Sequence, residues 1–145
     1  MDFLTGLKIS SSALKAQRTR MGAISSNIAN AQTTRTPEGG PYRKKEVVFG
    51  AEPARESFSD ILEGELDQYG QKVHATEVIS SNAPPILKYE PDHPDANEKG
   101  YVAYPNINVM KEMSDMISAS RNYEANISAF NTTKSMAIKA LEIGR

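Results

Sequence analysis

The sequence has 145 residues, which is the length of one domain and too short for two independent cores. Its formal net charge of −1 excludes an overall basic field that would attract nucleic acid or an anionic membrane. It contains no cysteine, which excludes a disulfide framework, a thiolate metal site and a cysteine nucleophile. All eight prolines lie between Pro37 and Pro105, so both ends of the chain are free to form long helices.

The N-terminal segment has a helical apolar stripe. Leu7, Leu14, Met21 and Ile28 are seven residues apart, and Ile24 follows Met21 by three. This spacing predicts a helix from about Ser10 to about Asn30, with the serines at 10–12 as candidate caps. The first nine residues include Asp2, Thr5 and Lys8, so they lack the continuous apolar run of a secretory signal. Export would therefore need another route.

The middle of the chain carries the turn-forming residues and short strand patterns. Residues 36–41 have the composition of an exposed loop, and strands are predicted at 44–49, 72–79, 86–89 and 101–104. Residues 52–69 are acidic and weakly patterned, which predicts a loop. The middle is thus expected to be a small β-rich region of low hydrophobic content.

The C-terminal segment has the longest helical pattern. Val109, Met116, Tyr123, Phe130 and Ala137 are seven residues apart, and Met113, Ile127 and Leu141 follow three of them by four residues. The pattern predicts a helix over residues 107–143, about 55 Å long. A helix of this length cannot be covered by so small a domain, so it needs the N-terminal helix, other copies of the chain, or both. The predicted fold class is mainly α, with two long terminal helices pairing as a coiled coil around a small β-rich insertion.

The faces away from these stripes are rich in Ala, Ser and Asn, where a solvated helix usually carries Glu and Lys. Two interpretations remain open, namely a surface helix made of good helix formers or a helix pair surrounded by other helix pairs. In the second, small and amide side chains allow close contact between subunits. The candidates for such faces are Ala16, Asn27, Asn30, Ala119, Asn126 and Asn131.

Charge is unevenly distributed along the chain. Residues 1–50 carry eight basic and three acidic side chains, a net of +5, whereas residues 51–99 carry four and eleven, a net of −7. This asymmetry favours either local pairing within one subunit or head-to-tail contact between copies.

No catalytic residue, metal site or cofactor is predicted. Ser12 and Lys15 have the Ser-x-x-Lys spacing of acyl enzymes, but no Lys-Thr-Gly element follows them. Glu90, Asp92, His93 and Asp95 supply ligand atoms without the spacing of a calcium loop, and His74 has no patterned serine or acid nearby. The basic run at 43–45 is short for a nucleic-acid site, and a solvated strand end explains it better.

Two terminal motifs resemble a known family. Ser12-Ala-Leu-Lys-Ala-Gln17 and Arg20-Met-Gly-Ala-Ile-Ser-Ser-Asn-Ile-Ala-Asn30 are similar to the N-terminal signature of bacterial flagellar rod and hook proteins. The C-terminal segments at 106–110, 116–126 and 131–145 resemble the closing helix of that group, and residues 35–45 and 91–105 resemble its proximal rod proteins. Residues 51–72 match least. The resemblance covers both ends and most of the middle.

The resemblance implies a structural function without catalysis. It implies that residues 1–34 and 106–145 form one helical core that builds a tube, with residues 35–105 displayed outside it. Leu14, Met21, Ile24 and Ile28 would then face Met116, Tyr123, Ile127 and Phe130. The tube would be the proximal rod of the flagellar basal body, which crosses the periplasm, transmits torque and encloses the export channel.

The resemblance also implies partners. These are other copies of the chain, neighbouring rod proteins and the flagellar type III export apparatus, with no nucleic acid and no direct membrane insertion. Phe3 and Leu7 match a short export signal read at the export gate, although the same spacing also fits an ordinary contact at the start of a helix. The alternative function is a cytoplasmic coiled-coil adaptor, which the two terminal helices alone would permit.

Overall fold

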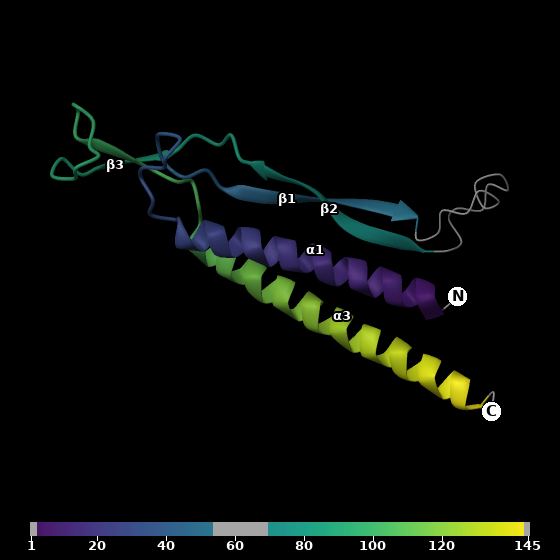
Figure 1. The fold of residues 1–145 in the computed structure, drawn as a ribbon. Helices are drawn as coiled ribbons and strands as arrows, with labels where there is room; N and C mark the ends of the chain where they lie inside the picture. The colour runs from purple at the N-terminus through teal and green to yellow at the C-terminus, as the bar shows by residue number, and fades with distance from the viewer. Residues whose placement is uncertain (1–2, 54–69, 144–145) are drawn as a thin grey trace.

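The computed structural model describes residues 3–53 and 70–143. In these two ranges, the long helices α1 (Phe3–Ala29) and α3 (Val109–Ile143) stand before and after four strands, which form two separate two-stranded sheets. The helices lie side by side and antiparallel, so the start of α1 and the end of α3 lie at the same end of the molecule and the strands leave from the opposite end of the pair (Figure 1). The predicted fold class, mainly helical with a small β-rich insertion, is confirmed.

Helix α1 begins seven residues earlier than the sequence pattern predicts. The serines at 10–12 therefore lie inside the helix and do not cap it. The hydroxyl of Ser12 donates to the carbonyl of Ile9 at 2.7 Å and accepts the backbone N–H of Val73 at 3.2 Å. The serine thus ties a strand to the helix, which is a contact that no local pattern reveals.

Helix α3 closely follows the prediction. Asn108 caps its first turn, because the side-chain oxygen accepts the backbone N–H of Lys111 at 3.2 Å. The helix runs for 35 residues, or about 52 Å at the usual rise. Within the described residues, neither helix is long and apolar enough to cross a membrane.

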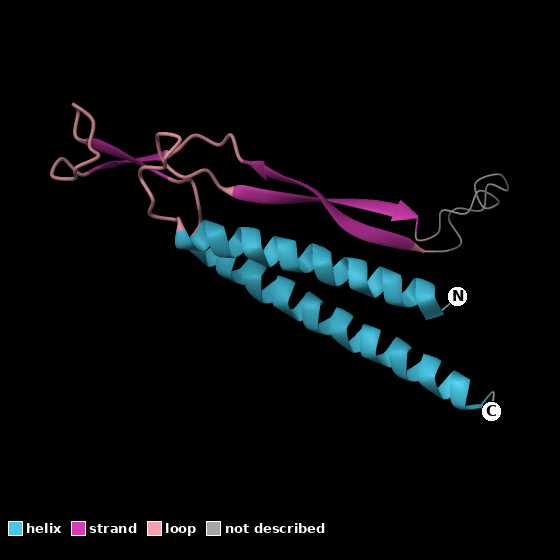
Figure 2. Cartoon of the chain, viewed as in Figure 1, coloured by secondary structure: helices cyan, strands magenta, loops and turns pink. Residues whose placement is uncertain are grey.

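The strands form a long hairpin and a short one (Figure 2). Strand β1 (Lys45–Pro53) pairs antiparallel with β2 (Gln71–Ser80), with a bulge between Val48 and Phe49, and β3 (Ile86–Tyr89) pairs with β4 (Tyr101–Tyr104). The four predicted strands are confirmed. Of the predicted loop at 52–69, residues 52 and 53 belong to β1, and residues 54–69 lie outside the described residues.

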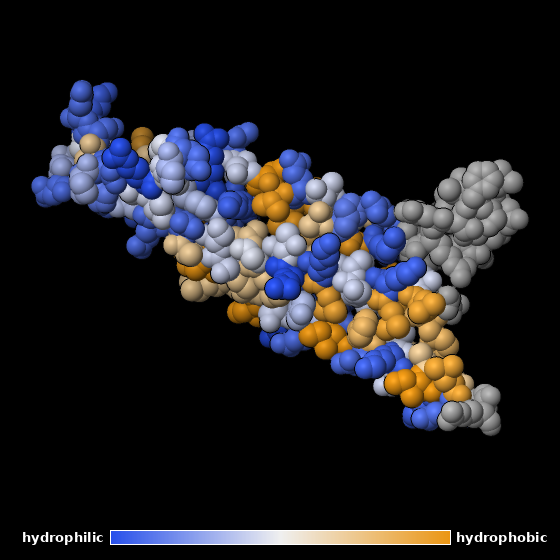
Figure 3. All heavy atoms as spheres, viewed as in Figure 1, coloured by the Kyte–Doolittle hydropathy of each residue, from blue (hydrophilic) through white to orange (hydrophobic). Residues whose placement is uncertain are grey.

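The molecule is built in layers around α1. The β1–β2 hairpin lies over one side of α1, and α3 packs on another (Figure 1). Among the residues that the structure describes, the buried apolar ones are few and mostly small: Ala16, Ala23, Ile24, Val102 and Ala119. On the face drawn in Figure 3, apolar residues gather toward the end that carries the chain termini and the β3–β4 end is mostly hydrophilic, although Ile86 and Leu87 of β3 are 45 % and 61 % exposed. The subunit therefore has a thin core and much apolar surface.

Candidate assembly site

The contact between the two helices runs along the whole of α1. Asn27 bonds to Glu112 at 2.9 Å, Arg20 pairs with Asp115 at 3.7 Å, and a Cβ added to Gly6 would lie 3.5 Å from Thr133 Cγ2. On α3, side chains that are buried or half-buried recur every three or four residues, which is the coiled-coil spacing. The residues that keep this spacing are Glu112, Met116, Ala119, Tyr123, Asn126, Phe130, Thr133 and Ala137, while Val109, Asp115 and Ser120 are also half-buried.

The residues expected at every seventh position of α3 are therefore partly buried. The second residue of each heptad that lies along the contact differs from the predicted one. Met113, Ile127 and Leu141 are 48 %, 38 % and 76 % exposed in the subunit. The companions that do lie along the helix contact, at Ala119, Asn126 and Thr133, follow the heptad positions by three residues instead of four. Because they are small or polar, a search for apolar residues passes over them.

On α1, the residues that bond to or approach α3 include Gly6, Arg20 and Asn27, whose spacing follows a heptad. The predicted stripe lies one position later, rotated by about 100°. Ile24 is buried, while the other stripe residues are half-buried, namely Leu7, Leu14, Met21 and Ile28. Ser12 and Thr19, one position earlier than the heptad of the helix contact, line the groove against β2 together with Ala16. The predicted stripe thus borders the helix contact on the side away from the hairpin.

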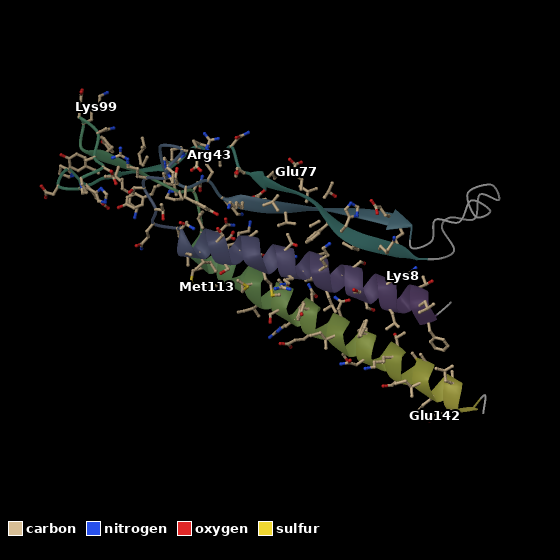
Figure 4. The ribbon with its side chains drawn as sticks, viewed as in Figure 1. Lys8, Arg43, Glu77, Lys99, Met113 and Glu142 are labelled. Atoms are coloured by element: carbon tan, nitrogen blue, oxygen red, sulfur yellow. The ribbon has the colours of Figure 1, made fainter. Side chains whose placement is uncertain are left out.

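The same rotation applies to the exposed apolar side chains of α3, which lie one position after those that face α1. Rotations of equal sense on two antiparallel helices lead to the same side of the pair. Both stripes therefore border one surface, which we call the apolar flank. It consists of Leu7, Leu14, Met21 and Ile28 of α1 with Met113, Ile117, Ile127, Ile138 and Leu141 of α3. Met113 lies near the junction end of α3, whereas Glu142 marks the other end (Figure 4).

Three of the six residues expected to contact neighbouring subunits are buried within the subunit itself. Ala16, Asn27 and Ala119 are 2 %, 1 % and 0 % exposed. The structure differs from the prediction here, because the small side chains are used to bring α1 close to the hairpin and to α3.

The other three candidates for subunit contacts are more accessible. Asn30, which follows the last residue of α1, and Asn126 of α3 are half-buried, and each donates to a carbonyl four residues earlier, at Ser26 and Asn122. Asn131 is exposed. A role for these three between subunits stays a prediction.

The proposed export residues lie on the first turns of α1. Phe3 is exposed, and Leu7, one turn later, is half-buried. Reading of this pair by an export gate stays a prediction.

A buried polar cluster lies at the junction where α1, β1 and α3 meet, and sequence reasoning missed its charged members. Glu112 is 2 % exposed, and one of its carboxylate oxygens lies 3.2 Å from the ammonium of Lys44. Glu46 lies at 3.2 Å from the same ammonium. The sequence signal that could have indicated this cluster is the position of Glu112, an acidic residue three residues after Val109 on the face that contacts α1.

Burial by itself would lower the pKa of Lys44, but hydrogen bonds to Glu112 and Glu46 and their negative charges outweigh it, so that the pKa is raised above the ordinary 10.5. A raised lysine pKa gives stability that is complete below the unfolded value and is lost as the pH rises through the folded value. We therefore expect this group to cause no pH dependence of the urea unfolding midpoint between pH 7 and 9, where its stabilisation is complete, and a decline above about pH 10.5. A Lys44→Met variant should show a smaller decline; an equal one would contradict this assignment.

The residues weighed for catalysis and metal binding are used in local hydrogen bonds. Glu90 accepts from the hydroxyl of Tyr104 at 2.8 Å, Asp95 accepts from Thr34 at 2.8 Å, and the ring of His93 accepts the backbone N–H of Asp95. Across residues 3–53 and 70–143, no three His, Asp or Glu side chains come close enough to hold a metal ion. The geometry therefore supports a structural role for these residues. The helix pair with its apolar flank remains the candidate functional site.

Two family models match the ends of the chain. Residues 7–35 match the model described as flagella basal body rod protein, and residues 98–143 match the C-terminal model of the flagellar basal body rod FlgEFG proteins. Both matches fall largely on the paired helices. The fold and these matches define a flagellar basal-body rod protein.

Full-length relatives narrow this class. The chain is 44 % identical to the flagellar basal-body rod protein FlgC of Bacillus subtilis, with all of both chains aligned. It is 42 % identical to FlgC of Borreliella burgdorferi over 99 % of this chain and 98 % of the relative, and 43 % identical to FlgC of an Escherichia coli O6:H1 strain over all of both. The chain belongs to the FlgC family of flagellar basal-body rod proteins, which are structural subunits of the rod.

Proposed function

We propose that the chain polymerises into the proximal part of the flagellar rod. Each subunit contributes its helix pair to the wall of a tube, which transmits torque as a drive shaft and encloses the channel used by later exported proteins. Contacts between unlike surfaces of successive copies produce an open helical assembly when repeated. The contribution of this chain is mechanical, and no catalytic step belongs to it.

The apolar flank is the observation that carries this proposal. It runs along the outside of two helices, and its α3 residues are exposed in the single subunit. A soluble monomer rarely leaves a long apolar stripe uncovered, and such a surface marks a site of association. The flank is also continuous with the helix contact, so the helix of a neighbour would extend the same packing.

In this proposal, the terminal segments and the middle of the chain have different roles. Residues 1–34 and 106–145 would form the assembling core, and residues 35–105 would be displayed by it. The partners would be other copies, adjoining rod proteins and the flagellar type III export apparatus, and the location would be the rod where it crosses the periplasm. Export without a cleaved signal peptide, with Phe3 and Leu7 read at the export gate, is part of the proposal.

Fractionation of basal bodies tests the proposed function. Deletion of the gene should abolish swimming, and expression of the chain from a plasmid should restore it and place the chain in detergent-extracted basal bodies, detected by immunoblotting. Cytoplasmic proteins should be absent from the same fraction. Recovery of the chain only in the cytoplasm of swimming cells would contradict the proposal.

A further inference from the structure

The junction cluster joins three segments that are distant in sequence. It lies where the C-terminal turns of α1, the first turn of α3 and the start of β1 come together (Figure 1). Its central side chain, Asn27, is 1 % exposed and bonds to Glu112, which is 85 residues away in the chain. Here the hairpin is connected to the helix pair.

Asn27 uses its whole hydrogen-bonding capacity. Its oxygen accepts the backbone N–H of Lys45 at 2.8 Å and the hydroxyl of Tyr42 at 3.2 Å. Its nitrogen donates to the carbonyl of Lys45 at 2.9 Å and to Glu112 at 2.9 Å. An amide has two donors and two acceptor sites, so all are satisfied. By binding both backbone groups of Lys45, the side chain pairs with the first residue of β1 as a neighbouring strand would.

Glu112 completes the cluster from α3. One carboxylate oxygen accepts from Asn27, and the other faces the ammonium of Lys44 at 3.2 Å. The carboxylate also lies in the first turn of α3, where the helix dipole favours a negative charge. Three segments are thus fixed at one point by groups that lose their partners if any one segment moves.

The chemistry of the cluster indicates a role in orientation. A buried ion pair is weak evidence for stability, because desolvation offsets much of the attraction, whereas its directional bonds discriminate strongly between arrangements. Along the hairpin, Val48, Phe49, Val78 and Ile79 remain exposed, so apolar packing alone holds it loosely. Two sets of directional bonds therefore orient the hairpin, namely the junction cluster at its base and the bond between Ser12 and Val73 farther along α1.

We propose that Asn27 and Glu112 are positioning residues for assembly, which hold the β1–β2 hairpin at one fixed direction relative to the helix pair. This inference rests on the proposed function, since a lattice of subunits requires every subunit to present its hairpin in the same place. A subunit with a loosened junction keeps both helices but presents the hairpin over a range of directions, and its incorporation into the rod decreases.

The absence of native cysteine allows a direct test of direction. Nitroxide labels at Lys8→Cys on α1 and Glu77→Cys on β2, both exposed, report the distance between helix and hairpin (Figure 4). Pulsed electron paramagnetic resonance should give a narrow distance distribution in the otherwise native chain. Asn27→Asp, which removes both donors and places a carboxylate against Glu112, should broaden it. The Lys45 amide should exchange its hydrogen about tenfold faster or more.

Two further variants keep the test decisive. Glu112→Gln preserves shape and an acceptor for Asn27 but removes the ion pair, so it should broaden the distribution even if Asn27→Asp does not fold. Asn131→Asp makes the same chemical change at an exposed position of α3 and should leave the distribution narrow. Helix content by circular dichroism should remain unchanged in Glu112→Gln and in this control.

The assembly step is read separately, in basal bodies. Glu112→Gln should lower the amount of chain in that fraction several-fold at equal expression. Narrow distributions in both junction variants would overturn the inference, and so would broad distributions with normal incorporation. Absence of the native chain from basal bodies would instead contradict the proposed function.

Discussion

Phe130→Asp is expected to abolish swimming while the protein is still made. Phe130 lies on the face of α3 that packs against α1. An ionised aspartate at this position would lose hydrating water without gaining a cation or a hydrogen-bond donor in its place. Burying such a charge is costly enough to separate the helices or unfold them. Tyr123→Asp, one heptad earlier on the same face, should have the same effect. Motility on soft agar with immunoblots of whole cells measures both.

The matched control is Ser128→Asp, an exposed position of α3 between these two side chains and outside the helix contact. It should leave the helix content of the purified subunit unchanged, whereas Phe130→Asp should reduce it. Cells that swim normally with Phe130→Asp would show that this residue does not lie in the helix contact of the working protein.

The double variant Met113→Asp/Ile127→Asp is expected to stop assembly without unfolding the subunit. Both side chains are exposed on the apolar flank, so in the monomer the new carboxylates are hydrated. Surface changes of this kind usually alter the free energy of unfolding by less than about 0.5 kcal/mol per site. When a neighbour covers the flank, the same carboxylates become buried and association is lost. Thermal unfolding should therefore be nearly unchanged while swimming and basal-body incorporation fail.

Ser114→Asp supplies the comparison for this second prediction, because it places the same charge beside Met113 but turned away from the flank. It should reduce incorporation less than the double variant does. If the double variant assembles into rods at the native level, the apolar flank is not a contact between subunits.

The elements of this fold could largely be predicted from the sequence. Long heptad patterns free of proline define α1 and α3, and short alternating segments between turn residues define the four strands. The early start of α1 could not be predicted. In its first turns Thr5 is buried and Gly6 lies against Thr133 of α3, and the apolar pattern indicates neither contact.

The candidate site was predicted less completely, for a physical reason. Apolar periodicity identifies residues that avoid water. It does not show whether they are covered by another part of the same subunit or by a neighbouring subunit. The pattern therefore places Met113 and Ile127 in the helix pair, although they lie on the flank. It places Ala119 between subunits and does not single out Glu112, although both lie along the helix pair. Tertiary contacts between distant segments decided both outcomes.

Because the two helices are antiparallel, the two ends of the subunit differ in structure, and the subunit is polar along its long axis. The start of α1 and the end of α3 lie at one end of the molecule, and the β3–β4 hairpin lies at the other (Figure 1). A column of such subunits stacked the same way has two chemically different ends. A different protein can therefore bind each end, and a newly arriving subunit can be accepted in one orientation only.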